Sequence, residues 1–74
     1  MEELTYIQVF STNVFQDFDK ERVATILSAE PLIEEWNIAM DDRDRVLRVV
    51  SHELQPHQII QLVNKCGYEC RELE

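Results

Sequence analysis

The sequence is poor in the residues on which several kinds of site depend. Gly67 is its only glycine, which excludes the glycine-rich loop that cradles a phosphate group. Its two cysteines, Cys66 and Cys70, are too few for a disulfide scaffold. No apolar run approaches the ~20 residues of a membrane-spanning helix. The start of the chain also has no basic and apolar leader, so we expect a cytoplasmic protein with two free thiols.

Positive charge is scarce as well. Seven Lys and Arg residues stand against fifteen Asp and Glu residues, which gives a formal net charge of −8. Such a chain repels the phosphate backbone of nucleic acids and the surface of anionic membranes, so we expect neither as a partner. The charge favours a cationic partner, protein or metal, or serves only to keep a small protein soluble.

Hydrophobic residues are plentiful enough for one folded domain. They make up 45% of the 74 residues, whereas disordered chains are poor in them. A chain of this length falls within the size of one domain, and folding buries only roughly 60% of the surface that the unfolded chain exposes. We therefore expect residues 1–74 to form a single domain with little stability to spare.

Local patterns predict six short elements without a linker. Apolar residues recur with period two in the strand segments and at i, i+3 and i+4 in the helical segments. The predicted order is a strand at 4–14, a helix at 19–29, strands at 32–40 and 45–51, a helix from Pro56 to Gly67 and a strand at 68–73. Two right-handed crossovers around a hairpin give an α+β, ferredoxin-like βαββαβ sandwich. Its four-stranded antiparallel sheet has both helices on one face and the first and third strands at its centre.

Single residues predict several details of these elements. Asp17 or Asp19 can accept hydrogen bonds from the free N–H groups at the start of the first helix. Gly67 lies where the end of a helix favours a left-handed residue. Trp36 is in phase with Ile38, and we therefore predict that it packs on the helix side of the sheet.

The order and spacing of these motifs resemble a known family. The matching residues are Val23 and Leu27, Trp36-x-Ile38-x-Met40, Val46 to Val50, Leu54-x-Pro56-x-x-Ile59 and Val63-x-x-Cys66-Gly67-Tyr68. Over nearly the whole chain, they resemble the heavy-metal-associated domain, the module of copper chaperones and metal-transporting ATPases. The resemblance implies a domain that binds soft metal ions through a Cys-x-x-Cys pair in the loop leading into the first helix.

The chain departs from the family at that pair. An alignment without gaps, counted back from Leu27 and Val23, places Gln16 and Asp19 at the two cysteine positions. Cu(I) selects soft sulfur ligands, and an amide with a carboxylate cannot replace two thiolates. We therefore expect the fold to be retained and the metal site to be lost, with no cofactor, and Asp19 to serve as a helix cap.

The remaining soft ligands are cysteines and histidines elsewhere in the chain. Cys66 takes an apolar position at the end of the second helix, so we expect it to be buried and slow to react. Its spacing from Cys70 does not by itself bring both sulfurs to one ion. His52 and His57 flank the start of the second helix and are interpreted as solvated surface residues. A metal site built from these residues stays an alternative.

The predicted sheet leaves one face uncovered by helices. If Ile7 and Val9 face the helices, alternation places six residues on the uncovered face: Tyr6, Gln8, Phe10, Val46, Arg48 and Val50. Because aromatic residues and arginine are enriched in interfaces, we expect this face to contact another protein or a second copy, with Phe10 as the anchor. The alternative is that β-branched residues lie here only because strands favour them.

The sequence contains no nucleophile–base signature that predicts catalysis. We interpret it as a non-enzymatic protein-interaction module that resembles a heavy-metal-associated domain with a degenerate metal site. The alternative is a metal-binding, metallochaperone-like protein in which Cys66, Cys70 or a histidine serves as a replacement ligand.

Overall fold

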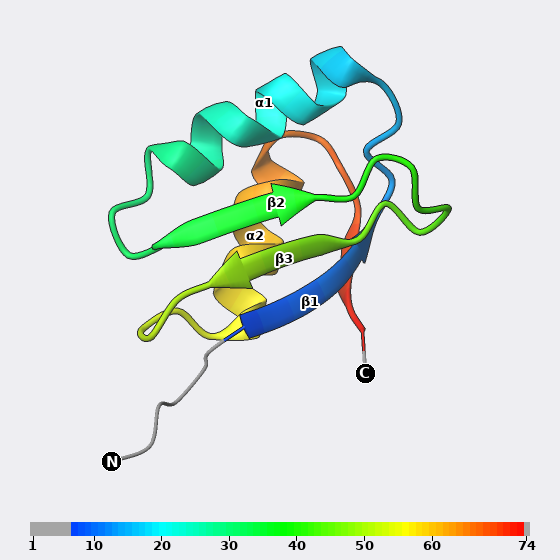
Figure 1. The fold of residues 1–74 in the computed structure, drawn as a ribbon. Coiled ribbons are helices and arrows are strands. Elements are labelled where there is room, and N and C mark those ends of the chain that lie inside the picture. The colour runs from blue at the N-terminus through cyan, green and yellow to red at the C-terminus, as the bar shows by residue number, and fades with distance from the viewer. Residues whose placement is uncertain (1–6, 74) are drawn as a thin grey trace.

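The computed structural model describes residues 7–73 and contains the six predicted elements in the predicted order. They are β1 (Ile7–Thr12), α1 (Asp17–Ser28), β2 (Glu35–Ile38), β3 (Leu47–Val50), α2 (Pro56–Lys65) and β4 (Cys70–Glu72). The sheet is antiparallel with the strand order β2-β3-β1-β4, so the first and third strands are central as predicted. Both helices cover one face of the sheet and leave the other open (Figure 1). The predicted ferredoxin-like fold is confirmed.

One hydrophobic core lies between the sheet and the two helices. Its fully buried apolar side chains come from β1, the loop after β1, β3 and both helices: Phe10, Val14, Leu47, Val49, Val23, Leu27, Ile59 and Val63. Trp36 packs against this core and places its indole N–H 3.4 Å from the Ser28 hydroxyl on α1. The prediction that Trp36 lies on the helix side of the sheet is therefore confirmed. Within residues 7–73 no helix has the length and apolarity needed to cross a membrane.

The end of α2 confirms the expectation for the single glycine. Gly67 has a φ of +95°, the left-handed conformation in which a residue without Cβ is favoured. The N–H of Gly67 donates to the carbonyl of Asn64 at 2.9 Å, and the N–H of Tyr68 donates to the carbonyl of Val63 at 3.4 Å. This pair of bonds is a Schellman motif, which satisfies the last carbonyls of the helix and turns the chain toward β4.

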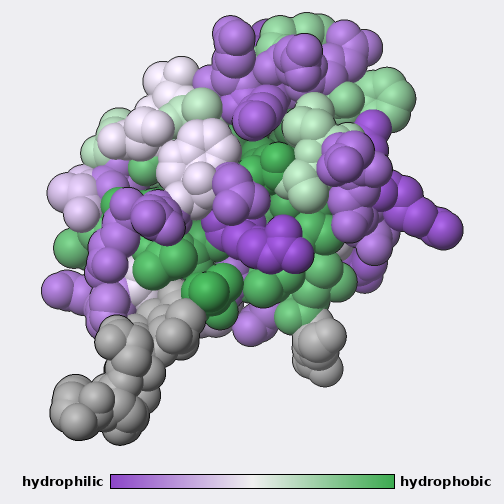
Figure 2. Space-filling view, in the orientation of Figure 1, coloured by the Kyte–Doolittle hydropathy of each residue, from purple (hydrophilic) through white to green (hydrophobic). Residues whose placement is uncertain are grey.

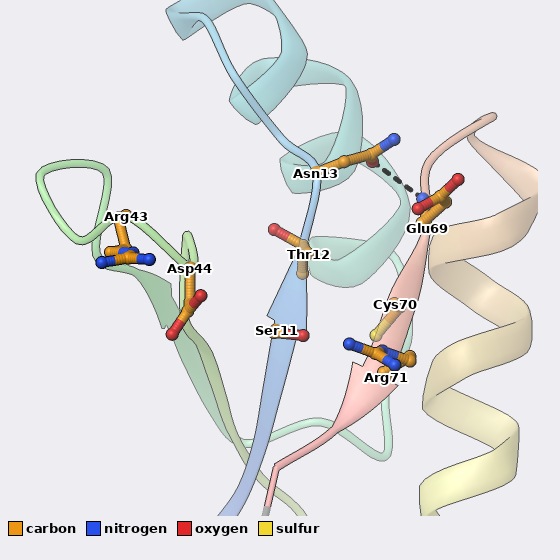
Figure 3. A pocket seen from close by; sticks show the side chains of 8 residues that line it. All are labelled: Ser11, Thr12, Asn13, Arg43, Asp44, Glu69, Cys70 and Arg71. Atoms are coloured by element: carbon orange, nitrogen blue, oxygen red, sulfur yellow. Dashed lines mark hydrogen bonds between the residues drawn. The ribbon is translucent and has the colours of Figure 1, made fainter.

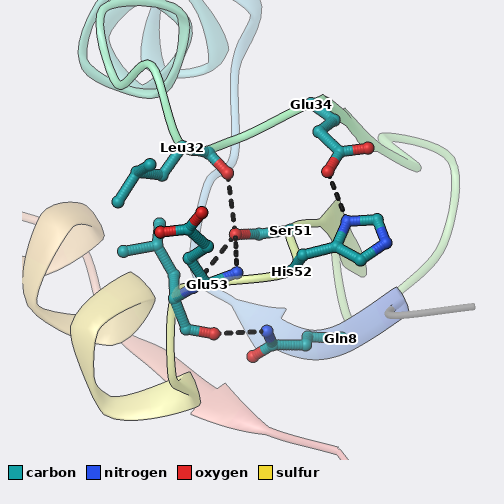
Figure 4. Close-up of polar contacts among 7 residues, drawn as sticks. Gln8, Leu32, Glu34, Ser51, His52 and Glu53 are labelled. Carbon is teal, nitrogen blue, oxygen red and sulfur yellow. Dashed lines mark hydrogen bonds and ion pairs between the residues drawn. The ribbon is translucent and has the colours of Figure 1, made fainter.

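The first strand faces the opposite way from our prediction. Phe10 is 0% exposed and belongs to the core, and the side-chain amide of Gln8 donates to the carbonyl of Leu54 at the start of α2, at 2.9 Å (Figure 4). Ile7, at 48% exposed, and Val9 therefore lie on the open face. The alternation was misassigned because apolar residues occupy both phases of this strand. Burying Phe10 removes the largest apolar area from water, and Gln8 finds an acceptor on the same side.

The four other residues predicted for the open face differ in their outcome. Val46 is only 6% exposed, and it lies just before β3 rather than within it. Arg45, the preceding residue, has a left-handed φ of +46°, so the strand alternation does not extend back to Val46. Arg48 is exposed and Val50 is half-buried on the open face, in the phase that was predicted. Tyr6 lies outside the described residues.

A buried serine holds the chain where β3 leads into α2, a feature that the sequence did not reveal. Ser51 is buried, and its hydroxyl donates to the carbonyl of Leu32 at 2.7 Å (Figure 4). The same oxygen accepts the N–H groups of Leu54 at 3.1 Å and Glu53 at 3.3 Å. This one side chain therefore connects the segment before β2 with the turn before α2.

Candidate functional site

The loop leading into α1 is closed by hydrogen bonds to one carboxylate. Gln16 is the N-cap residue, and helix α1 begins at Asp17, two residues earlier than predicted. One carboxylate oxygen of Asp19, the third helical residue, accepts the N–H of Gln16 at 2.9 Å and that of Phe15 at 3.3 Å. Asp19 therefore satisfies N–H groups just before the helix, a capping role of the kind predicted, although Gln16 occupies the cap position itself.

The other oxygen of the same carboxylate contacts the far end of the chain. The hydroxyl of Tyr68, which directly follows Gly67, donates a short hydrogen bond to Asp19. This bond, followed by the N–H of Gln16, lowers the pKa of Asp19 below its ordinary value. The same bond raises the pKa of Tyr68, because ionised tyrosine could not donate its proton to a carboxylate. The two positions that align with the family's metal ligands thus belong to a cap that links α1 to the end of α2.

This arrangement provides a poor site for a soft metal ion. Both oxygens of Asp19 already accept hydrogen bonds, and Gln16 offers only an amide. Neither residue supplies the sulfur that Cu(I) prefers. Within residues 7–73 no cluster of three or more His, Cys, Asp or Glu side chains could hold a metal ion.

The two cysteines are free thiols in different surroundings. Cys70 on β4 is buried against the core, and burial raises its pKa to about 12. Cys66, the C-cap residue of α2, is only half-buried, so the prediction that it is buried was wrong. It was wrong because the chain turns away at Gly67 and leaves this last position at the rim of the core. Cys66 is therefore the more accessible thiol, although partial burial raises its pKa too.

The two histidines do not join the cysteines in a site. His52 lies at the end of β3, and its Nδ1 contacts the carboxylate of Glu34 (Figure 4). His57 is exposed in the first turn of α2. Both are surface residues as predicted, and the contact with Glu34 adds an ion pair whenever His52 is protonated.

The open face of the sheet carries one exposed and two half-buried apolar residues around an arginine. Ile7, Val9 and Val50 lie on this face of the two central strands, with Arg48 directly opposite Val9 in the β1–β3 register. The view onto this face shows hydrophobic surface gathered around a strongly hydrophilic spot over the strands (Figure 2). The face predicted to be an interaction surface therefore exists, but its apolar part comes from Ile7 and Val9 rather than Gln8 and Phe10.

A polar hollow of about 380 Å³ lies at one end of this sheet face. It is lined by the ends of β1 and β4 and by the loop between β2 and β3: Ser11, Thr12, Asn13, Arg43, Asp44, Glu69, Cys70 and Arg71 (Figure 3). Arg71 lies opposite Ser11 in the β1–β4 register. The hollow therefore continues the open face toward the sheet edge.

Two exposed phenylalanines flank the start of α1. Phe15 is 66% exposed and Phe18 is 54% exposed. The guanidinium of Arg45 lies 5.2 Å from the Phe15 ring centre, and that of Arg22 lies 6.0 Å from the Phe18 ring centre. These cation–π contacts cover part of the rings and hold them beside the cap. No local pattern in the sequence predicts the exposure of these two rings, because it depends on where α1 begins.

No protein-family model and no curated protein sequence matches the chain. Solved structures match over nearly its whole length. The yeast copper transporter domain Ccc2a, solved in apo and Cu(I)-loaded states, has a TM-score of 0.78 at 15% identity, covering 96% of this chain and 97% of that one. The chain has the fold of the heavy-metal-associated domains. Ccc2a has also been solved in an Atx1–Cu(I)–Ccc2a complex.

Two further structures with this fold show how widely it is shared. The first domain of the human copper chaperone for SOD1 has a TM-score of 0.80 at 11% identity, covering 95% of this chain and 94% of that one. Oxidized MerP from Ralstonia metallidurans CH34 has a TM-score of 0.81 at 11% identity, covering 96% of this chain and all of that one. At these identities the backbone is shared while most side chains differ. Function must therefore be argued from the side chains of this chain.

Proposed function

We propose that this protein is a non-enzymatic protein-interaction module in which the metal loop of the heavy-metal-associated fold has become a helix cap. The observation that carries the proposal is the double use of the Asp19 carboxylate. One oxygen accepts the N–H groups of Phe15 and Gln16, and the other accepts the Tyr68 hydroxyl. The loop is thereby closed by groups of the protein itself.

The chemistry of the loop supports the loss of metal binding. A soft ion would have to displace these hydrogen bonds and would gain only an amide and a carboxylate oxygen in return. The carboxylate also fits its structural role, because a negative charge near a helix N-terminus is favourable there. Two thiols remain in the chain, but Cys70 is buried with a raised pKa and resists the deprotonation that metal binding requires.

An interaction role is supported by what the fold does elsewhere and by the surface of this chain. The similar Ccc2a domain is found in a complex with another protein. On this chain, the open sheet face combines apolar residues with an arginine, a combination enriched in interfaces. We also propose a cytoplasmic location, the reducing setting in which Cys66 and Cys70 stay free.

A metal titration tests the proposal. The reduced protein is titrated with Cu(I) and, separately, with Zn(II), and bound ions are counted by native mass spectrometry. We expect no stoichiometric ion at sub-micromolar affinity. One bound ion per chain would contradict the proposal. Loss of that ion in a Cys66→Ser or Cys70→Ser variant would then identify replacement ligands.

A further inference from the structure

We infer that the open sheet face is a docking surface for an acidic segment of another protein, in which carboxylates alternate with aliphatic side chains. This inference rests on the interaction role proposed above and names the partner's chemistry. It starts from Arg48 on the central strand β3. Among residues 7–73, the guanidinium group of Arg48 makes no hydrogen bond or ion pair, although the chain is strongly acidic.

Two more arginines share this side of the molecule with Arg48. Arg71 on β4 lies opposite Ser11, in the same phase as Ile7 and Val9, and Arg43 projects from the loop between β2 and β3. Both line the hollow at the end of the face (Figure 3). Within the described part of the chain neither makes an ion pair. Three guanidinium groups that have no ion-pair partner among the described residues therefore lie on this side of the molecule.

Acidic residues are few on this face. Glu35 on β2 and Asp44 in the β2–β3 loop belong to it. Glu69 also lines the hollow, and its backbone N–H donates to the side-chain oxygen of Asn13 at 2.8 Å (Figure 3). The other carboxylates of the described residues lie on the helices or in the loops, apart from Glu72 on β4, which pairs with the buried Phe10 and so lies in the phase of the helix side of the sheet. This side therefore carries three arginines and three carboxylates, whereas the chain as a whole has seven basic and fifteen acidic residues.

The apolar residues near Arg48 indicate that the partner also needs aliphatic side chains, besides carboxylates for the arginines. Ile7, Val9 and Val50 expose aliphatic surface next to Arg48, because Val9 pairs with Arg48 and Ile7 pairs with Val50. A partner that offered charge alone would leave this surface wet. A segment that carries carboxylates among aliphatic side chains would pair the guanidinium groups and cover the apolar surface at once.

The arginines of the open face and the net charge of the chain disfavour other binding partners at this face. In a two-fold dimer packed through this face, each copy would bring Arg48 toward its equivalent in the other copy, and like charges facing each other are costly. Nucleic acids and anionic membranes would meet the arginines but also the net charge of −8 carried by the rest of the chain. An acidic segment of a protein can instead be short enough to lie on the face alone.

Titration with designed peptides tests the inference by NMR. The labelled protein is titrated at low salt, with chelator and reductant present, with a twelve-residue peptide of alternating Glu and Val. A matched peptide carries Lys in place of Glu. We expect the Glu peptide to shift the amide signals of Val9, Arg48 and Arg71, and the Lys peptide to leave them unchanged. Because metal is excluded, the result is independent of the metal titration.

Two charge reversals act as matched variants. Arg48→Glu should weaken binding of the Glu peptide at least about tenfold, because it places like charges in contact. Lys65→Glu on α2 makes the same change in net charge away from the open face, and it should weaken binding much less. The spectra of both variants report whether they are folded.

Several results would overturn the inference. The first is that the Glu peptide shifts none of the amide signals of Val9, Arg48 and Arg71. The second is that the Lys peptide binds as well as the Glu peptide. The third is that Arg48→Glu and Lys65→Glu weaken binding of the Glu peptide equally. Self-association of the free protein through Val9 and Arg48 would also overturn it and would favour a second copy. Each of these results leaves the metal titration standing as a separate test.

Discussion

The two helices of this protein begin in nearly the same way, although only the first follows the loop that aligns with the family's metal site. Each has a glutamine N-cap whose N–H donates to the side chain of the third helical residue. In α1 the bond from Gln16 to Asp19 is 2.9 Å, and in α2 the bond from Gln55 to Gln58 is 2.7 Å. The two positions that align with the family's metal ligands therefore form an ordinary helix start, like the one at α2.

The two helix starts differ in the charge of the third residue and in the number of groups that this residue contacts. Gln58 is a neutral amide, whereas Asp19 is a carboxylate that also accepts the Phe15 N–H and the Tyr68 hydroxyl. The α1 start is thus connected to the end of α2 and carries two groups that titrate. The loop before α1 therefore connects two helices, whereas the cap of α2 closes only its own helix. Substitutions that remove each connection in turn test this difference.

The largest effect is expected at Gly67, which positions Tyr68 for its bond to Asp19. Gly67→Val should lower the free energy of unfolding by about 1–3 kcal/mol, because a β-branched residue is strained at a φ of +95°. No described heavy atom lies within 4 Å of the position of an added Cβ, so the cost is conformational rather than steric. Gly67→Asn should be milder, since asparagine tolerates this region. Urea denaturation that gave equal losses would argue against the left-handed end.

Replacing the third residue of each helix, Asp19 in α1 and Gln58 in α2, measures how much each side chain stabilises its helix start. Asp19→Ala should lower the melting temperature by about 4–8 °C, the shift expected for a lost cap in a domain of this size. Gln58→Ala should lower it less, because Gln58 accepts only the Gln55 N–H. Circular dichroism melts of the two variants provide the measurement. An equal or larger loss in Gln58→Ala would show that Tyr68 and Phe15 add nothing to the α1 start.

Acid should weaken the α1 start but not the α2 start. The pKa of Asp19 is lower in the folded protein than the value of about 3.9 expected in the unfolded chain. The stabilisation is therefore fully present above about pH 4 and is lost as the pH falls through the folded pKa. Asp19→Asn should flatten this part of the stability curve, whereas Gln58→Glu should not. An unchanged acid slope in Asp19→Asn would contradict the role given to the carboxylate.

The smallest effect is expected at alkaline pH. The pKa of Tyr68 is raised above its usual value of about 10, so its contribution is present below that pH and is lost as the pH rises through the folded pKa. Absorbance at the tyrosinate band should show Tyr68 ionising later in the parent than in Asp19→Asn. Ionisation at the same pH in both proteins would mean that the Tyr68–Asp19 bond is absent in solution.

Most of the fold could be predicted because several local signals agree. Gly67 marked the end of α2, and Trp36 and Ile38 fixed the phase of β2, since apolar residues occupy only one phase there. The phase of β1 could not be read in this way, because Ile7 and Val9 compete with Phe10. The complete burial of Phe10, and the contact between Gln8 and Leu54, 46 residues apart, show which side faces the helices.

The site was only partly visible in the sequence. The alignment identified Gln16 and Asp19, and Asp19 was expected to cap the helix. Gln16 was missed as the N-cap because glutamine is not among the residues that favour that position. The bond from Tyr68 to Asp19 spans 49 residues and has no local signal. It became visible only once the end of α2 was placed beside the start of α1.

The most direct test of the central claim restores the family's ligands to this loop. Gln16→Cys and Asp19→Cys are introduced together into a Cys66→Ser, Cys70→Ser background, which removes the other thiols. Cu(I) binding to this variant and to the background protein is then measured by competition with a chelator, with circular dichroism to confirm folding. We predict one Cu(I) at sub-micromolar affinity in the restored variant and none in the background. Tight binding by the background, or a folded restored variant that binds no Cu(I), would contradict the account.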